Sequence, residues 1–236
     1  MAGAEEMIKA ILFDLDNTLM DFLMFKKETA MAAARAMREN GLPAEEKEIY
    51  EKIFAIYDRM GIECQKTFHE VVKPYGLDIN KSELIQQAAI TAYLKKKFET
   101  LRPYPEVKPV LAKLRGMGLK LGVVSDAPRN KAWQRLVITG LQDEFELVIT
   151  HSDTLELKPH PSPFRLALER LGANADEVLF VGDNPARDIA GAKKIGMKTC
   201  LAKYGCQDYS EEMDVADFRI GKFEELIEVM EKIGGD

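Results

Sequence analysis

The distribution of apolar residues divides the chain into strand-like runs and helix-like stretches. The first strand-like run extends from Ile8 to Phe13 and is apolar except for Lys9, with acidic and polar residues on both sides. A short apolar run of this kind fits a strand that is buried on both faces at the centre of a parallel sheet. We therefore expect the fold to be organised around this strand.

A long helical stretch follows the first strand. Apolar residues recur in it at intervals of three and four, which is the spacing of amphipathic helices. Breaks that contain glycine and proline separate successive helices, and Asn80 with Glu83 fits a capping box at the start of the last one. A stiff connector rich in proline, from Arg102 to Pro105, then leads out of this stretch. The pattern predicts an inserted helical domain over residues 20–102.

Strand-like and helix-like segments alternate through the rest of the chain, with short turns between them. This order is typical of βαβ units in a parallel sheet. The expected strands are residues 119–124, 147–150, 178–181 and 198–201. The expected helices are residues 107–114, 128–138, 164–171, 188–195 and 223–233. The sequence therefore predicts an α/β fold whose core domain consists of residues 1–19 and 103–236.

Composition narrows the classes of partner. The chain has 236 residues, 46% of them hydrophobic, and a net charge of −6, which argues against a nucleic acid or an anionic membrane as the main partner. No apolar run approaches the roughly 20 residues that span a bilayer, and the N-terminus is acidic where a signal peptide is basic. We expect a cytoplasmic protein. The three cysteines have no CxxC spacing and indicate neither disulfides nor a zinc site. The sequence leaves the oligomeric state open.

Two carboxylates, Asp14 and Asp16, follow the first strand directly. Side chains two positions apart in an extended segment point the same way, so both can face one spot beyond the carboxyl end of the strand. Ligands bind at that edge in open α/β sheets. Neighbouring anions repel each other, so a cation, a shared proton or a polar ligand is expected between them. The alternative is that Asp14, Asp16 and Asn17 only shape a turn or cap a helix.

Further polar groups occur at or just after other expected strand ends. They are Ser125, Lys158, and Asp183 with Asp188. Taken singly, these residues also fit a helix cap, a solvated lysine and a turn beside Gly182. Together at one sheet edge they form an anionic site with a hydroxyl and an ammonium beside it. Mg²⁺ prefers carboxylate ligands and often bridges to phosphate, and a carboxylate is able to attack phosphorus. The residues therefore indicate Mg²⁺-dependent phosphoryl transfer.

These motifs resemble those of the haloacid dehalogenase superfamily of hydrolases. The superfamily's four motifs match, in order, Asp14 to Leu19 (DxDxT), Ser125, Lys158, and Gly182-Asp183 with Asp188. The helical insert resembles the C1-type cap, which lies between the first two motifs. The resemblance implies a Rossmann-like, doubly wound parallel sheet with strand order 3-2-1-4-5 and the first strand at its centre.

The resemblance also implies roles at the reacting end of the site. Asp14 corresponds to the nucleophile and a Mg²⁺ ligand. Asp16 corresponds to the general acid and base, which also offers its backbone carbonyl to the metal. Asp183 corresponds to a direct Mg²⁺ ligand, with Asn184 and Asp188 just outside the direct ligands.

Three residues correspond to the phosphate cradle of the family. Ser125 and Lys158 are expected to hold the phosphoryl oxygens, with a backbone amide at Asp126 beside them. Arg129 is a candidate contact for a substrate anion, and His69 is a candidate surface or structural histidine. The specificity-determining contacts are expected in the cap.

Asp16 selects among the activities of this superfamily. The dehalogenases lack a carboxylate at the matching position because a halide leaves without a proton, so its presence favours hydrolysis of phosphate monoesters. Expected substrates are small phosphorylated metabolites such as glyceraldehyde 3-phosphate or phosphoglycolate. Three alternatives remain: a sugar phosphomutase, a receiver-like module that carries a phosphorylated aspartate, and a binding protein built on an inactive core.

Overall fold

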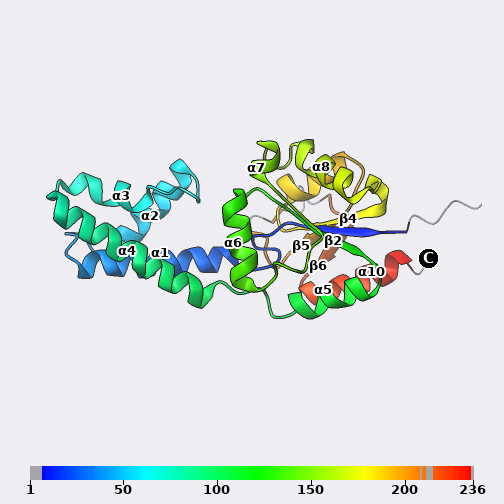
Figure 1. The fold of residues 1–236 in the computed structure, drawn as a ribbon, viewed down its shortest axis with the longest axis horizontal. Coiled ribbons are helices and arrows are strands. Elements are labelled where there is room, and N and C mark those ends of the chain that lie inside the picture. Colours follow the sequence, from blue (N-terminus) through cyan, green and yellow to red (C-terminus); the bar gives the residue numbers. More distant parts are fainter. Residues whose placement is uncertain (1–6, 208, 211–214, 235–236) are drawn as a thin grey trace, which may run out of the picture. The chain divides into compact units, whose positions relative to one another are not determined.

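The computed structural model describes residues 7–207, 209–210 and 215–234. The chain divides into two compact units, shown in Figure 1. The core unit comprises the described residues of Met1–Asp21 and Arg102–Asp236, and the helical unit comprises Phe22–Leu101. No helix among the described residues is long and apolar enough to cross a membrane.

A parallel sheet forms the centre of the core unit. Its strands are β1 (Ala10–Phe13), β2 (Lys120–Ser125), β3 (Leu147–Thr150), β4 (Val178–Gly182), β5 (Lys198–Ala202) and β6 (Phe218–Ile220). The strand order is β3-β2-β1-β4-β5-β6, and every neighbouring pair is parallel. All four residues of β1 are buried, as expected for a central strand covered on both faces. The expected order 3-2-1-4-5 is confirmed.

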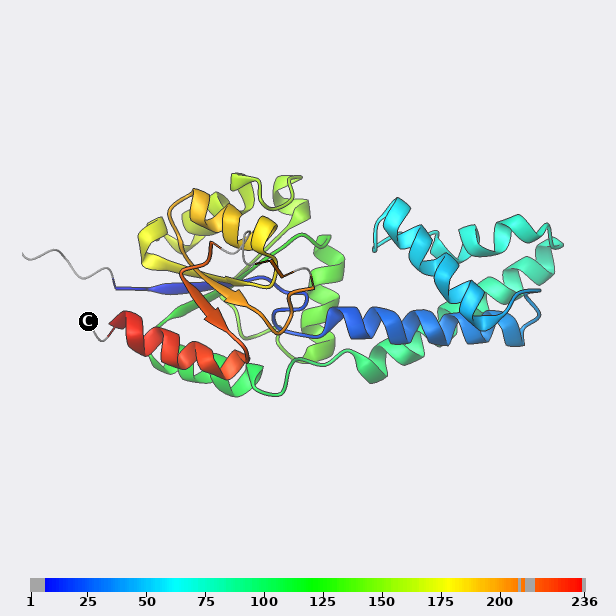
Figure 2. The ribbon, with the colours of Figure 1, turned by 180° about the vertical axis from the view of Figure 1, so that it is seen from behind.

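The sixth strand was not predicted from the sequence. Figure 2 shows β6 beside β5 at the edge of the sheet. It has three residues, of which only Ile220 is fully buried. A segment this short carries no recognisable alternation of apolar and polar positions.

Helices cover both faces of this sheet. They are α5 (Val107–Gly116), α6 (Arg129–Thr139), α7 (His151–Thr154), α8 (Pro161–Leu171), α9 (Ala190–Lys194) and α10 (Leu226–Gly234). Figures 1 and 2 show α8 and α9 on one face and α5 and α10 on the other. On the first face, Phe164 packs edge-on against Phe180 with ring centroids 5.1 Å apart. This double covering keeps the sheet interior apolar and leaves its carboxyl edge as the polar end.

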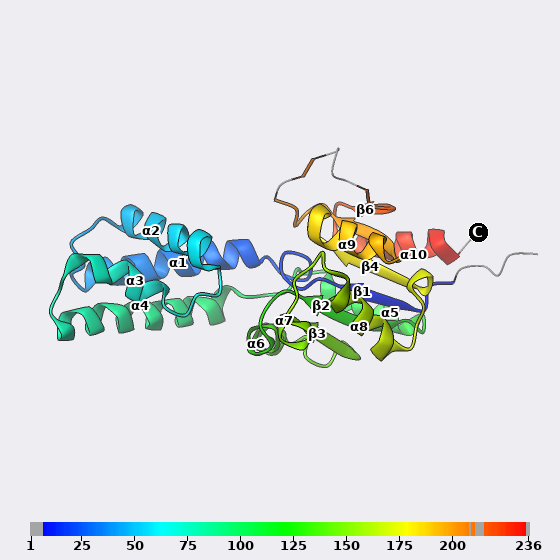
Figure 3. The same cartoon turned by 90° about the horizontal axis from the view of Figure 1, so that it is seen from above.

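The helical unit consists of α1 (Phe22–Glu39), α2 (Glu46–Met60), α3 (Thr67–Val72), a 3₁₀ turn (Lys73–Tyr75) and α4 (Ile79–Thr100). Figures 1 and 3 both show α1 and α4 side by side. Ala33, Met37, Ile53 and Ile85 are fully buried in the core of this unit. The apolar residues that recur at helical spacing in the sequence therefore form the core of this unit.

The start of α4 differs from the expected capping box. Asp78 is its N-cap and accepts a hydrogen bond from the Lys81 backbone N–H at 3.0 Å. Asn80 and Glu83 already lie inside the helix. The prediction of an Asn80–Glu83 box was wrong because Asp78, two residues earlier, is an equally good cap residue.

Candidate active site

The candidate site lies at the carboxyl ends of the three central strands. β1 pairs with β2 and with β4, and Phe13 at its end is level with Val123 and Val181. The Asp14 backbone N–H donates to the Val181 carbonyl at 2.9 Å and extends β1 by one residue. These parallel strands end within two residues of one another, so the polar residues at their ends are brought to one edge of the sheet.

Three buried carboxylates form the centre of the site. One oxygen from each of Asp14, Asp183 and Asp188 lies within 4.8 Å of the other two. A π-helical turn, Pro185–Ile189, brings Asp188 back to the cluster, and the Asp188 carboxylate accepts a hydrogen bond from the Asn184 N–H at 3.0 Å. A Cβ atom at Gly182 would lie 2.5 Å from Cβ of Asp188. Glycine is therefore required at position 182 so that Asp188 can pack against the strand end.

Lys158 provides the buried positive charge. Its side chain is 1% exposed, and its Nζ hydrogen bonds to Asp14 and lies 2.7 Å from Oδ1 of Asp188. Nζ also donates to the Val124 carbonyl at 3.0 Å. The structure thus places the lysine of the third motif directly against the candidate nucleophile.

One ammonium does not balance three buried carboxylates. Burial raises the pKa of Asp14 to about 7, against the attraction of Lys158 and with further repulsion from Asp188. Burial also raises the pKa of Asp183 to about 8, helped by repulsion from Asp14 and Asp188. Each shift shows that the protein alone stabilises the charged carboxylates poorly.

The cluster fits a divalent cation. The buried Oδ1 atom of Asp183 receives no hydrogen bond from any group within the described part of the chain. The groups of the cluster that could bind a metal are the carboxylates of Asp14, Asp183 and Asp188, and oxygen ligands of this kind suit hard cations. A cation at this point would relieve the surplus negative charge and would bind the orphaned oxygen.

Ser125 and Asp126 follow β2 beside this cluster. The Ser125 side chain is buried, and its Oγ accepts a hydrogen bond from the Ala127 N–H at 3.1 Å. The Asp126 carboxylate accepts the Lys158 backbone N–H at 2.9 Å, which ties the loop of the third motif to the end of β2. These contacts hold Ser125 and Lys158 at the same strand edge.

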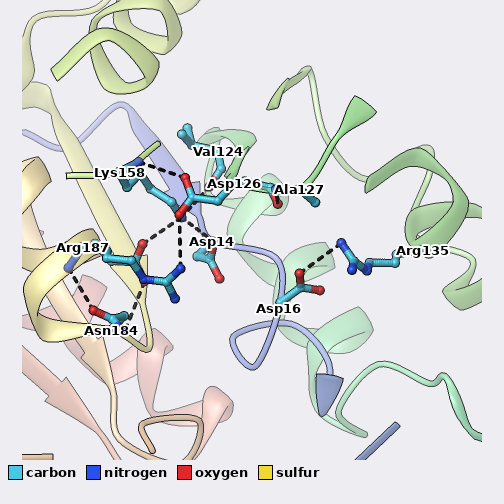
Figure 4. Close-up of polar contacts among 11 residues, drawn as sticks. Asp14, Asp16, Val124, Asp126, Ala127, Arg135, Lys158, Asn184 and Arg187 are labelled. Atoms are coloured by element: carbon cyan, nitrogen blue, oxygen red, sulfur yellow. Dashed lines mark hydrogen bonds and ion pairs between the residues drawn. The ribbon is translucent and has the colours of Figure 1, made fainter. Parts of the chain in front are cut away.

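Two arginines at the site were missed from the sequence. Arg187 pairs with Asp126 at 3.3 Å, and Arg135 pairs with Asp16 at 3.0 Å. Figure 4 shows Asp14, Lys158 and Arg187 on one side and Arg135 approaching Asp16 from the other. Arg187 stands inside the fourth motif, where its position beside Asp188 was a usable signal. Nothing in the sequence pointed to Arg135, because its partner is far away in the chain.

The remaining candidates are an arginine of the core unit and a histidine of the helical unit. Arg129 donates to Asp153 at 2.7 Å and lines a separate hollow of about 630 Å³ together with Trp133 and Arg170. His69 is exposed on α3.

Three comparisons with known proteins agree on one group. A sequence model of the family described as "Haloacid dehalogenase-like hydrolase" matches residues 11–202. The chain is 35% identical to a glyceraldehyde 3-phosphate phosphatase of Methanopyrus kandleri, over 98% of this chain and 100% of that protein. It is 29% identical to a phosphoglycolate phosphatase of Aquifex aeolicus, over 95% and 97%. The crystal structure of a HAD phosphatase from Thermococcus onnurineus superposes with a TM-score of 0.63 at 28% identity, covering 94% of this chain and 98% of that one.

Proposed function

This chain belongs to the haloacid dehalogenase-like hydrolase family, and from that premise we propose that it hydrolyses the phosphate ester of a small metabolite. One observation carries the proposal. The buried carboxylate of Asp14 lies against Lys158 and beside two further carboxylates, while a second carboxylate, Asp16, stands two residues along the chain. A nucleophile, a charge partner and a separate acid are the groups that ester cleavage at phosphorus requires.

In the first half of the reaction, a carboxylate oxygen of Asp14 attacks the phosphorus atom. The bond between phosphorus and the ester oxygen breaks, and Asp16 gives its proton to that departing oxygen. Lys158 and Ser125 hold the other phosphoryl oxygens, aided by the backbone amide near Asp126. The products of this half are the free alcohol and a phosphorylated Asp14.

In the second half, Asp16 accepts a proton from a water molecule while that water attacks the phosphorus atom. The bond between phosphorus and the Asp14 oxygen breaks, which regenerates the Asp14 carboxylate and releases inorganic phosphate. Asp16 is thereby reprotonated for the next cycle, so the same carboxyl group serves as acid and then as base.

We propose Mg²⁺ as the cation of the carboxylate cluster. Asp14, Asp183 and the backbone carbonyl of Asp16 would hold it, with Asn184 and Asp188 just outside. Mg²⁺ would supply positive charge to the carboxylates and to the phosphoryl oxygens. The orphaned oxygen of Asp183 and the raised carboxyl pKa values support this assignment.

For the substrate, we propose glyceraldehyde 3-phosphate first and phosphoglycolate second. The names of the full-length relatives support this order, since the relative called glyceraldehyde 3-phosphate phosphatase is 35% identical and the one called phosphoglycolate phosphatase is 29% identical. We propose that the helical unit, Phe22–Leu101, acts as the cap and makes the contacts that choose between such substrates.

The test is phosphate release from both esters and from p-nitrophenyl phosphate, with Mg²⁺ or with EDTA, in the wild type and in Asp14→Asn. We expect turnover only in the wild type with Mg²⁺, since the amide cannot form the phosphorylated intermediate. Circular dichroism and thermal melting serve as the folding control for the variant. Turnover by Asp14→Asn equal to the wild type would contradict the proposal, as would a folded wild type that cleaves none of the esters.

A further inference from the structure

Arg135 is a buried arginine that contacts the carboxylate of Asp16. It lies in the middle of α6, its side chain is 4% exposed, and its Nη1 is 3.0 Å from Oδ2 of Asp16. Figure 4 shows that the Asp16 carboxylate points toward Arg135, whereas Asp14 belongs to the group around Lys158. Two carboxylates that are neighbours in the sequence are therefore held by two different cations on opposite sides.

The backbone around Asp16 is shaped by a tight turn. Asn17 adopts the left-handed conformation with φ of 59°, and Asp16 forms an isolated β-bridge with Met20. This fixes the main chain, but the aspartate side chain still has three staggered rotamers available. A contact with a rigid partner selects one of them.

Arg135 is suited to that purpose. The guanidinium group is planar and permanently charged, and it binds carboxylates in a defined geometry. Helix α6 packs its buried residues Ala132 and Leu136 into the interior, so the backbone that carries Arg135 is itself fixed. The Asp16 side chain is 23% exposed. Its carboxylate is therefore held by the Arg135 guanidinium, which has little freedom to move.

We propose that Arg135 is a positioning residue that sets where the Asp16 carboxylate lies during catalysis. This inference rests on the proposed acid and base role of Asp16. Arg135 should matter in the steps that use Asp16, namely protonation of a poor leaving group and activation of water. It should not matter when Asp14 attacks an ester whose leaving group needs no proton.

The test compares Arg135→Met, which keeps an unbranched side chain about as long as the arginine stem but cannot pair, with Arg135→Lys. With p-nitrophenyl phosphate, we expect kcat of Arg135→Met to fall by roughly 10- to 100-fold, within the range for general acid/base groups. KM should fall in parallel, so kcat/KM stays within about twofold of the wild type, because kcat/KM reports attack by Asp14 and not hydrolysis of the intermediate. The first turnover should appear as a burst of p-nitrophenol. Arg135→Lys should recover part of kcat.

An alkyl phosphate provides the second arm, because its leaving oxygen needs a proton. Here kcat/KM itself should fall by roughly 10- to 100-fold in Arg135→Met. A double variant, Asp16→Asn with Arg135→Met, should show the same kcat/KM for the alkyl phosphate as Asp16→Asn alone, because Arg135 acts through Asp16.

Leu136→Ala is the matched control for a merely structural role. Leu136 is fully buried next to Arg135 on the same helix, so this variant lowers the melting temperature without removing the contact to Asp16. We expect no burst from it. A burst in Leu136→Ala, or equal losses for both classes of ester in Arg135→Met, would overturn the inference. Failure of the wild type to turn over any ester would instead contradict the proposed function.

Discussion

At the scale of single residues, three buried carboxylates share one buried ammonium. One oxygen from each of Asp14, Asp183 and Asp188 lies within 4.8 Å of the other two, and Lys158 contacts two of these residues. Gathering like charges away from water costs free energy unless a compensating charge is present. The surplus charge is the reason that this site is expected to depend on a metal both for stability and for chemistry.

A pH dependence of stability follows from the raised pKa of Asp183. Its pKa is about 8 in the folded protein and near 3.8 when unperturbed, because burial and then Asp14 and Asp188 disfavour the charge. Between these values the folded state binds more protons than the unfolded state, so the free energy of unfolding falls as pH rises. In EDTA, we expect the wild type to lose at least about 2 kcal/mol more than Asp183→Asn between pH 4 and pH 8.

Urea denaturation of both proteins at several pH values measures this difference. Saturating Mg²⁺ should stabilise the wild type increasingly as pH rises, because Mg²⁺ competes with protons for the carboxylates. It should stabilise Asp183→Asn much less. Parallel pH profiles for the two proteins, or equal stabilisation by Mg²⁺, would contradict the assignment of Asp183.

The sequence indicated those candidate site residues that stand next to a recognisable apolar run, and it missed those whose partners are distant in the chain. Asp14, Ser125 and Asp183 each stand at or just after the end of an apolar run, so each was a candidate from its own stretch of sequence, and their combination at one sheet edge indicated a site. The partner of Arg135 lies in a distant segment, and a buried arginine in a helix looks the same in sequence as an exposed one. Such pairs appear only after the chain has folded.

At the scale of elements, polar contacts between Asp217 and Thr199 help to hold the sixth strand, β6, against β5. Asp217, just before β6, accepts hydrogen bonds from the N–H and the hydroxyl of Thr199 at 2.9 and 2.7 Å. The Asp217 N–H donates to the Thr199 hydroxyl in return, and Lys193 contacts the same carboxylate at 2.6 Å. These contacts tie β6 to β5, and no periodicity of apolar residues reveals them.

Asp217→Asn should therefore loosen the edge of the sheet. Burial opposes the charge on Asp217, but the hydrogen bonds from Lys193 and Thr199 outweigh it and hold the pKa below its usual value. Its stabilising contribution is present above the unperturbed pKa and is lost as pH falls through the lowered one. We expect a loss of about 1 kcal/mol at pH 7.

Denaturation of Asp217→Asn and the wild type at pH 7 and at pH 3 checks this. The two curves should approach each other at the lower pH, where the wild-type carboxylate also becomes protonated. Catalytic parameters should stay unchanged, since Asp217 touches none of the site residues named above. A stability difference that is the same at both pH values would show that the carboxylate charge is not what holds β6.

At the scale of the whole molecule, the helical unit interrupts the core at one point. Met20 and Pro103 form an antiparallel bridge, and the Tyr104 N–H donates to the Leu19 carbonyl at 3.1 Å. All of these residues belong to the core unit, so the two chain ends that lead to the insert are held side by side by core contacts. The change from strand-like to helical patterning in the sequence indicated this insertion. The sequence carried no sign that the two segments that lead into and out of the insert are hydrogen bonded to each other.

This arrangement predicts that the core folds without the insert. Replacing residues 22–101 with a short Gly/Ser linker joins two points that already lie close together, so the loop that must close is shorter than in the full chain. All strand pairs of the sheet lie within the core unit and are retained. We expect a cooperative thermal transition, and stabilisation by Mg²⁺ like that of the full chain, because the carboxylate cluster also belongs to the core.

Cleavage of p-nitrophenyl phosphate should persist at a reduced rate in the shortened protein. Any preference between glyceraldehyde 3-phosphate and phosphoglycolate should disappear, because the proposed specificity contacts lie in the removed unit. Retention of the full chain's preference by the shortened protein would place the specificity contacts in the core instead.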